Sequence, residues 1–450
     1  MSSILLRGGR VIDPANGRDE IADVVLDNGR IAEPGSTAAD ATVIDATGKW
    51  IVPGLIDPHV HLRDPGFPEK ETILSGLRAA AAGGFTAVAA MANTFPVNDS
   101  PETTRYMLDR SRAAHSARLV PVSAVTRSLG GAELVDFEAM ATAGARLFSD
   151  DGIPIDDPEL LARALVETKR LGFAISLHEE DRELSDEAPV NAGEVSRRLG
   201  VHGYPVAAEA RRIKRDLAIA RASDAPVHIA HLSCAESVRL VREARGIGTR
   251  VTCEVTPHHF ALDETAFLRW GPNAKMNPPL RNRADVKAIR EAILDGTVDM
   301  IATDHAPHDP GSKQLAHLVG CFAGPQGMGP LSHREAAFLS RSANGVVGLE
   351  TAVGLAFGLF HGGVFSATRM VEMMSLNPAR LLRLDAGTLS LGAVADVTVL
   401  DPSFEWSVDP RRFLSRSRNT PFMGMSLTGK AMLTIVGGEI VYDSRGSSGR

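Results

Sequence analysis

The sequence has few cysteines and no long hydrophobic run. Its three cysteines, Cys234, Cys253 and Cys321, are not arranged as C-x-x-C, which argues against a disulfide framework and indicates a reducing compartment. No stretch approaches the roughly 18 uncharged apolar residues that a membrane span needs. The first residues also lack the basic region, apolar core and small-residue cleavage site of a secretory signal. We therefore expect a cytoplasmic protein.

The chain also lacks an excess of positive charge. Its 48 Lys and Arg against 55 Asp and Glu give a net charge of −7, so neither nucleic-acid binding nor binding to an anionic membrane is predicted. No G-x-G-x-x-G phosphate loop follows an early strand, which counts against a doubly wound open sheet. The 450 residues, 44% of them hydrophobic, allow two or three domains or one large barrel with an accessory domain.

The two ends of the chain have the same β-rich pattern. Apolar runs flank the turn dipeptides Gly8-Gly9 and Asn28-Gly29 near the start and Gly437-Gly438 near the end, as β-hairpins require. The similarity predicts one small β-sandwich built from residues 1–53 and 386–450.

Residues 54–385 have a different pattern, in which short apolar runs alternate with segments of helical composition such as 101–117 and 157–172. Eight strand–helix units of this kind predict a (β/α)8 TIM-type barrel, whose chemistry sits at the C-terminal ends of its strands. The candidate strands are 56–62, 85–91, 118–125, 145–150, 173–179, 225–233, 250–259 and 298–307.

Residues of metal-binding type recur at the ends of these candidate strands. Because alternate residues of a strand share one face, His59 and His61 are both expected to point into the barrel mouth. The full set of candidate ligands is His59, His61, Asp151, His178, His231 and Asp304. His228 lies on the opposite strand face from His231, and Cys234 and Cys253 lie in apolar runs, so we interpret all three as core residues. The mixture of imidazole and carboxylate suits zinc or a similar divalent ion.

Two ions require a bridging anion in addition to neutral imidazoles. In the simplest arrangement His59, His61 and Asp304 hold one ion, His178 and His231 hold the other, and Asp151 bridges them. Water bound in such a site is acidic enough to supply a nucleophile at neutral pH.

The chain resembles the dihydroorotases of the amidohydrolase superfamily in a series of motifs along nearly its whole length. In order these are GLIDPHVHLRDPG, MANT, SDDG, HEE, AHLS, EVTPHH, KMNPPLR, TDHAPH and GLET. The resemblance implies that Arg63, Asn93 and Asn277, with His61, hold the substrate while His308 closes over it. A guanidinium matches a substrate carboxylate bidentately, and Arg63, two residues beyond His61, is expected to continue the same strand face.

Two departures from the family pattern concern the site. Many relatives bridge their metals with a carboxylated lysine on the fourth strand, but this chain has Asp150 and Asp151 there. It is similar to the bacterial subtype in which the residue matching Asp151 is the bridge. The interval 309–345 is longer than expected, and the usual Ala-Pro-Phe-Gly is replaced by residues 342–345, which leaves Asn344 and Gly345 as candidate substrate contacts. We expect a long loop over 309–333, which would be a lid, a partner-binding surface or a disordered insertion without a function.

The predicted function is therefore that of a dihydroorotase with two zinc ions. It would cyclise N-carbamoyl-L-aspartate reversibly to L-dihydroorotate in pyrimidine biosynthesis, and Asp304 would be both a ligand and the catalytic acid and base. The alternatives are a hydantoinase or allantoinase, which the absent lysine and the presence of Arg63 disfavour, and an inactive subunit that supports aspartate transcarbamoylase. Such subunits lose metal ligands, whereas all six positions are occupied here. We expect a homodimer and consider a complex with aspartate transcarbamoylase.

Overall fold

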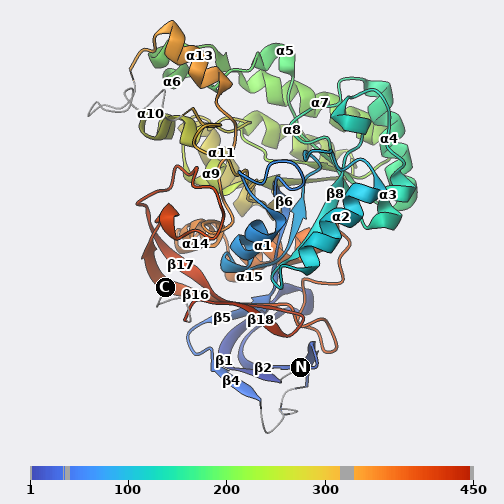
Figure 1. Cartoon of the computed structure of the whole chain (residues 1–450), viewed down its shortest axis with the longest axis vertical. Helices are drawn as coiled ribbons and strands as arrows, with labels where there is room; N and C mark the ends of the chain where they lie inside the picture. Colours follow the sequence, from blue (N-terminus) through green and yellow to red (C-terminus); the bar gives the residue numbers. More distant parts are fainter. Residues whose placement is uncertain (1–2, 34, 36–40, 315–328, 446–450) are drawn as a thin grey trace.

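The computed structural model describes residues 3–33, 35, 41–314 and 329–445. Figure 1 shows two units, a barrel surrounded by helices in the upper part of the view and a β-sheet below it. The loop predicted over 309–333 falls in large part outside the described residues, because 315–328 are not described, and Cys321 is among these.

The larger unit is a (β/α)8 barrel, as the sequence predicts. Its eight parallel strands are hydrogen-bonded in chain order, and nearly all of their residues are buried on both faces because helices cover the outside of the barrel. The first and last strands are joined just beyond the last one, where the His61 N–H donates to the His305 carbonyl at 2.8 Å. The strands, each overlapping one predicted segment, are β6 (Leu55–Val60), β7 (Phe85–Ala90), β8 (Arg118–Ser123), β9 (Leu147–Phe148), β10 (Ile175–Leu177), β13 (Val227–Ile229), β14 (Val251–Val255) and β15 (Met300–Ile301).

Helices follow the strands, and local sequence sets their ends. The two helical stretches predicted above form α2 (Pro101–Arg112) and α4 (Pro158–Leu171), each with a proline in its first turn and a side-chain N-cap, Ser100 or Asp157. The other helices that pack around the barrel are α1 (Ile73–Ala82), α3 (Phe137–Ala143), α7 (Val206–Ala222), α8 (Ala235–Gly246), α11 (Arg283–Leu294), α14 (Ala352–His361), α15 (Ala367–Val371) and α16 (Asn377–Leu381).

Additional short elements are inserted after three of the strands. Figure 1 shows α5, α6, α10 and α13 at the end of the barrel farthest from the lower sheet. Because these insertions begin at the C-terminal ends of strands, they form the walls of the barrel mouth. They are α5 (Arg182–Ser185), β11 (Val190–Asn191), α6 (Glu194–Leu199) and β12 (Gly203–Tyr204) after β10, α9 (Pro257–Ala261) and α10 (Ala266–Trp270) after β14, and α13 (His333–Arg341) after β15.

The smaller unit combines strands from both ends of the chain. The C-terminal strand β16 pairs antiparallel with β5, and β5 pairs parallel with β1. One continuous sheet results, which encloses a hydrophobic core of its own. Its strands are β1 (Ile4–Asp13), β2 (Arg18–Asp27), β3 (Arg30–Ala32), β4 (Thr42–Asp45), β5 (Trp50–Pro53), β16 (Val397–Ser407), β17 (Ser426–Val436) and β18 (Glu439–Asp443).

Two of the three predicted hairpin turns are confirmed and one is wrong. Asn28-Gly29 joins β2 to β3, and Gly437-Gly438 joins β17 to β18. Gly8-Gly9 lies inside β1, where the pairing register with β2 shifts. A Cβ atom at Gly9 would lie 2.6 Å from the Ile51 side chain, so this glycine allows close packing within the sheet. The chain reverses instead at Pro14–Asn16.

The two units pack together through aromatic residues and helices. The Trp50 ring of β5 lies 5.0 Å from the Phe357 ring of α14, between ring centroids, and α14 also packs against β17.

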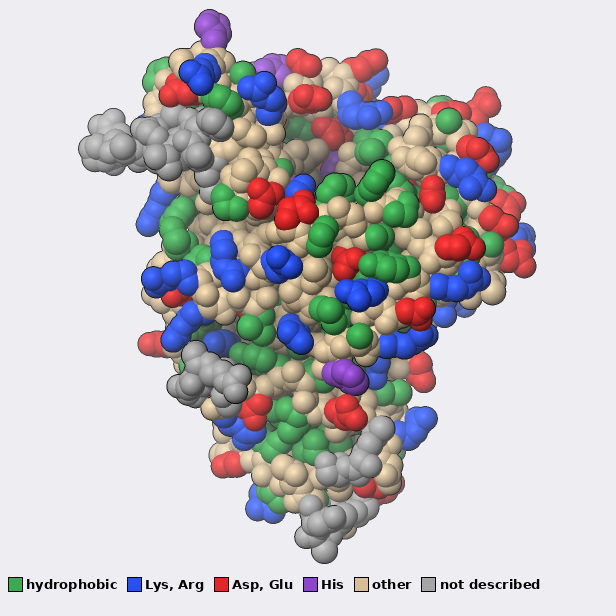
Figure 2. Space-filling view, in the orientation of Figure 1, with side chains coloured by type: hydrophobic (Ala, Val, Ile, Leu, Met, Phe, Trp, Pro, Cys, Tyr) green, Lys and Arg blue, Asp and Glu red, His purple; other side chains and the backbone are tan. Residues whose placement is uncertain are grey.

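Acidic and basic side chains are intermingled over the face of the molecule that Figure 2 shows. None of the helices within the described ranges is long and apolar enough to cross a membrane.

Candidate metal centre and active site

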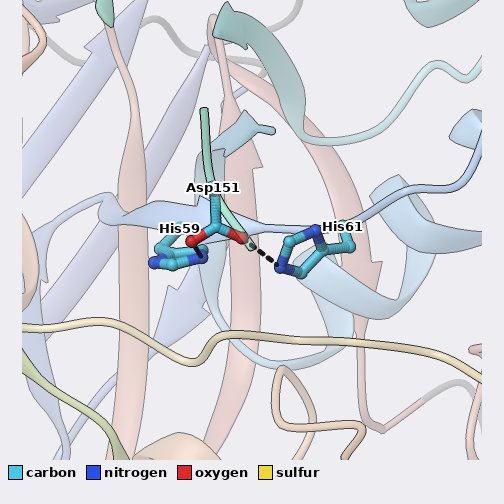
Figure 3. Close-up of side chains that lie close together, drawn as sticks. All are labelled: His59, His61 and Asp151. Carbon is cyan, nitrogen blue, oxygen red and sulfur yellow. Dashed lines mark ion pairs between the residues drawn. The ribbon is translucent and has the colours of Figure 1, made fainter. Parts of the chain in front are cut away.

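All six candidate ligands meet at the C-terminal ends of the barrel strands. Figure 3 shows the Asp151 carboxylate between the imidazoles of His59 and His61. One carboxylate oxygen lies 3.4 Å from His59 Nε2, and the other lies 3.4 Å from His61 Nε2. Asp304 approaches the same two rings, with its Oδ1 at 3.0 Å from His61 Nε2 and 3.6 Å from His59 Nε2. The four residues form one compact donor group.

A second donor group shares Asp151 with the first. Asp151 Oδ1 lies 3.5 Å from His178 Nδ1 and 3.7 Å from His231 Nε2. The donor atoms of Asp151, His178 and His231 lie within 4.8 Å of one another, as do those of Asp151, His59 and His61. A carboxylate common to two groups is the arrangement that two bridged ions require.

The buried nitrogen of His59 tests whether these residues suit a metal. His59 is fully buried, and its Nε2 has no hydrogen-bond partner among the described residues. An unpaired buried polar atom is costly in a folded protein unless something satisfies it. His59 Nε2 faces Asp151 and Asp304, so a divalent cation would be bound by all three residues. The donor set therefore fits a metal.

The backbone just beyond the strands turns several site residues inward. His231 and Asp304 have φ angles of +32° and +45°, in the left-handed region that non-glycine residues seldom adopt. Such conformations persist where surrounding structure enforces them, as at functional sites. Arg63 has a φ of +59°. It lies beyond β6, which ends at Val60, so a left-handed turn and not strand alternation directs Arg63 to the cavity that His61 also lines, where it was expected.

Each of three histidines is oriented through its second ring nitrogen. His59 Nδ1 contacts Glu254 Oε1 at 2.7 Å, and His61 Nδ1 contacts Asn93 Oδ1 at 2.8 Å. His178 Nε2 lies 3.3 Å from a carboxylate oxygen of Glu180. These contacts fix the orientation of each ring and leave its other nitrogen within 3.5 Å of an Asp151 oxygen.

Glu254 is a site residue that sequence reasoning missed. It is buried on β14, and its second oxygen contacts His228 Nε2 at 3.1 Å. Burial opposes its ionisation, but His59 and His228 lower the pKa of the Glu254 carboxyl to about 2. His228, interpreted as a core residue, is thus connected to a candidate ligand through a shared carboxylate. The available signal was a glutamate within the apolar run of β14.

The two neighbouring aspartates have different environments. Asp150 points away from the donor groups and accepts from the Val125 and Thr126 N–H groups at 2.7 and 3.1 Å. Burial raises the pKa of Asp150 to about 6 despite these hydrogen bonds. Burial also disfavours the charged form of Asp151, but His59 and the other imidazoles hold the pKa of its carboxyl well below the usual range. Only Asp151 faces both donor groups.

A cavity of about 220 Å³ opens above the donor groups, smaller than pockets that hold drug-sized ligands. The Arg63 guanidinium borders it and forms no ion pair with a carboxylate of the described residues; it contacts the Pro307 carbonyl and His308 instead. Burial lowers the pKa of Arg63 to about 10, so it stays charged at neutral pH. The other predicted substrate contacts that line the cavity are His61, Asn93, Asn277, His308, Asn344 and Gly345.

Asn419 is a second residue that the motifs did not reveal. Its side chain accepts from the His308 N–H at 3.0 Å and donates to the carbonyls of Ala306 and Gly345 at 2.9 and 3.1 Å. It comes from the segment between β16 and β17, more than 100 positions from His308 in the chain. No periodic pattern links segments so far apart.

Comparison with known proteins agrees with this geometry. Residues 48–237 match the family model described as Dihydro-orotase-like. The dihydroorotase of Geobacter metallireducens is 43% identical over 443 residues, covering 98% of this chain and 99% of that protein. The dihydroorotase of Anaeromyxobacter dehalogenans (strain 2CP-1) is 44% identical over 449 residues with the same coverage. The solved structure of L-hydantoinase (dihydropyrimidinase) from Arthrobacter aurescens shares the fold, with a TM-score of 0.83, 24% identity, and coverage of 98% and 96%.

The relatives that cover nearly the whole chain hydrolyse a cyclic amide bond of a small molecule, and the barrel has two overlapping His/Asp groups that fit a metal ion. Full-length identity above 40% then gives the narrower assignment. The chain belongs to the dihydroorotase family.

Proposed function

We propose that this chain interconverts N-carbamoyl-L-aspartate and L-dihydroorotate with two zinc ions. His59, His61 and Asp304 would hold one ion, His178 and His231 the other, and Asp151 both. The observation that carries this assignment is the membership of Asp151 in both donor groups. Nitrogen and carboxylate donors suit zinc, and the second group has only three protein donors, which leaves a position for water or substrate.

The cavity offers matching groups for a carboxylated cyclic ureide. Arg63 supplies a half-buried cation with no carboxylate partner among the described residues, and it would bind the substrate carboxylate bidentately. The Asn93 oxygen is engaged by His61, which directs its NH2 group toward the cavity. The Asn277 NH2 group donates to Glu180 at 2.8 Å, while its oxygen has no partner among the described residues. That oxygen would accept from a ring N–H.

Asp304 has the placement that proton transfer requires. Bound zinc would supply an activated water and polarise the ring carbonyl. Asp304 borders the cavity, with its Oδ1 at 3.0 Å from His61 Nε2, so its carboxylate would take the proton from the attacking water. As the C–N bond breaks, the same carboxyl would deliver that proton to the ring nitrogen. In the cyclisation direction, Asp304 would remove a proton from the ureido nitrogen.

Replacing Arg63 with Gln tests the assigned substrate. A hydrogen bond to a charged group contributes about 1.5–3 kcal/mol, so we expect KM for L-dihydroorotate to rise roughly 10- to 100-fold in Arg63→Gln. Steady-state kinetics of the metal-loaded enzyme would measure the change. An Arg112→Gln variant, at an arginine exposed on α2, is the control. Unchanged KM in Arg63→Gln would show that the substrate carboxylate binds elsewhere.

A further inference from the structure

The backbone segment 342–345 borders the cavity without forming a helix or a strand. Four consecutive carbonyl groups in it nevertheless accept hydrogen bonds from four different side chains. The pairs are Lys275 Nζ to Ser342 O at 2.6 Å, Lys313 Nζ to Ala343 O at 2.9 Å, His308 Nε2 to Asn344 O at 2.8 Å, and Asn419 Nδ2 to Gly345 O at 3.1 Å. The conformation of this segment is therefore set from outside it.

Lys313 has a fully buried side chain and no carboxylate partner among the described residues. Its ammonium group donates to the carbonyls of Pro272, Lys275 and Ala343, at 2.9, 3.1 and 2.9 Å. Burial holds the pKa of Lys313 well below its ordinary value, whereas the three carbonyls supply an acceptor for each donor of the charged form. Burying a cation is costly even when it is hydrogen-bonded, whereas an apolar residue would fill the same space. The three hydrogen bonds of Lys313 therefore fix the positions of the Pro272, Lys275 and Ala343 carbonyls relative to one another.

Lys275 holds the preceding carbonyl of the segment, that of Ser342. It is 3% exposed, and besides Ser342 it donates to the carbonyls of Leu339 and Ser340 at 3.0 and 2.9 Å. These carbonyls belong to the last turn of α13, whose carbonyl groups lack the i+4 amide partners of the helix interior. The Lys275 carbonyl in turn accepts from Lys313 Nζ and from the Gly345 N–H at 2.9 Å. The two lysines thus form one connected network.

The position of segment 342–345 determines two features of the cavity. His308 Nε2 lies 2.8 Å from the Asn344 carbonyl and 3.2 Å from the Arg63 guanidinium, and His308 Nδ1 has no partner among the described residues. Gly345 has a φ of +115°, and a Cβ atom there would lie 2.3 Å from the Ala306 Cβ. Such close contact leaves little room for the segment to shift without disturbing the residues around His308.

We propose that Lys313 and Lys275 are positioning residues, which hold segment 342–345 so that Asn344, Gly345 and His308 contact the substrate. Neither lysine lines the cavity. The inference rests on the proposed function of that cavity. A positioning role requires the hydrogen bonds from the lysines to the backbone. A purely electrostatic role, in which the lysine charge attracts an anionic substrate, would not require them.

The test compares Lys313→Met with Lys70→Met. Methionine keeps the length and apolar volume of Lys313 but removes its donors. Displacements of about 1 Å can cost roughly 10²-fold in rate, so we expect kcat/KM for L-dihydroorotate to fall by about that factor in Lys313→Met, chiefly through KM. Lys70 is partly buried, and its charge also acts on Arg63 and His308, yet it makes no hydrogen bond to segment 342–345. Lys70→Met should stay within about twofold of wild type, since solvent screens this cation.

Two results would overturn the proposal. A Lys313→Met enzyme with unchanged KM and a lowered melting temperature would show a purely structural role, and an equal loss in Lys70→Met would show an effect of charge.

Hydrogen exchange of the wild type gives a readout that needs neither turnover nor a variant. The Ala343 and Gly345 amides donate to the Ser312 and Lys275 carbonyls, so we expect slow exchange without substrate. Exchange as fast as in an exposed loop would contradict the proposal, whereas inactive wild-type enzyme would contradict only the proposed function.

Discussion

An Asp304→Asn enzyme is expected to lose about 10²- to 10⁴-fold in kcat for L-dihydroorotate, the usual contribution of a positioned acid or base. The asparagine side chain has the same shape, and its oxygen remains close to His61. It cannot take a proton from the attacking water at neutral pH or return one to the ring nitrogen. Steady-state kinetics in both directions would measure the loss, which should be similar in each because the same carboxyl serves both.

Metal content separates the two roles of Asp304. If Asp304→Asn retains its metal and loses turnover, proton transfer accounts for the defect. If metal and turnover are lost together, adding zinc at saturating concentration should restore occupancy but not kcat. Near-normal turnover in a metal-replete Asp304→Asn enzyme would contradict the assigned acid and base.

Replacing Asp151 with Asn is expected to remove metal from both donor groups and to abolish turnover. Even residues that only support a ligand contribute about 10- to 100-fold to metal affinity, so loss of the shared carboxylate should weaken binding by at least as much. Among the described residues, this carboxylate is also the only one common to both donor groups. Elemental analysis after dialysis against buffer without zinc would measure the metal that remains.

Asp150→Asn is the matched control, since it makes the same chemical change one residue earlier. The oxygen of the substituted side chain could still accept from Val125 and Thr126, as the Asp150 carboxylate does. Metal content and turnover should therefore stay near wild type. Loss of metal in Asp150→Asn with full occupancy in Asp151→Asn would show that the wrong aspartate has been assigned as the bridge.

The barrel could be predicted from the sequence because its strands are buried on both faces and so appear as short apolar runs. Six polar residues at the ends of those runs, such as His178 after β10, then indicated where the site lies. The turn assigned to Gly8-Gly9 was wrong because a glycine pair also permits close packing inside a strand. Local sequence does not distinguish the two uses.

Other parts of the site depend on contacts that no local pattern encodes. Asn419 and Lys313 contact carbonyls beside the cavity that lie far from them in the chain, and Arg63 is directed by a left-handed backbone conformation rather than by strand alternation. The predicted homodimer and the complex with aspartate transcarbamoylase stay predictions, because the composition of such interfaces is close to that of other protein surfaces.

The most direct test of the account is the turnover of L-dihydroorotate by zinc-loaded enzyme, with hydantoin and allantoin as competing substrates and the bound metal counted. We predict hydrolysis of L-dihydroorotate alone, two zinc ions per chain, and loss of activity on chelation that added zinc reverses. Hydrolysis of hydantoin or allantoin in preference to L-dihydroorotate, or full activity in enzyme without metal, would contradict the account.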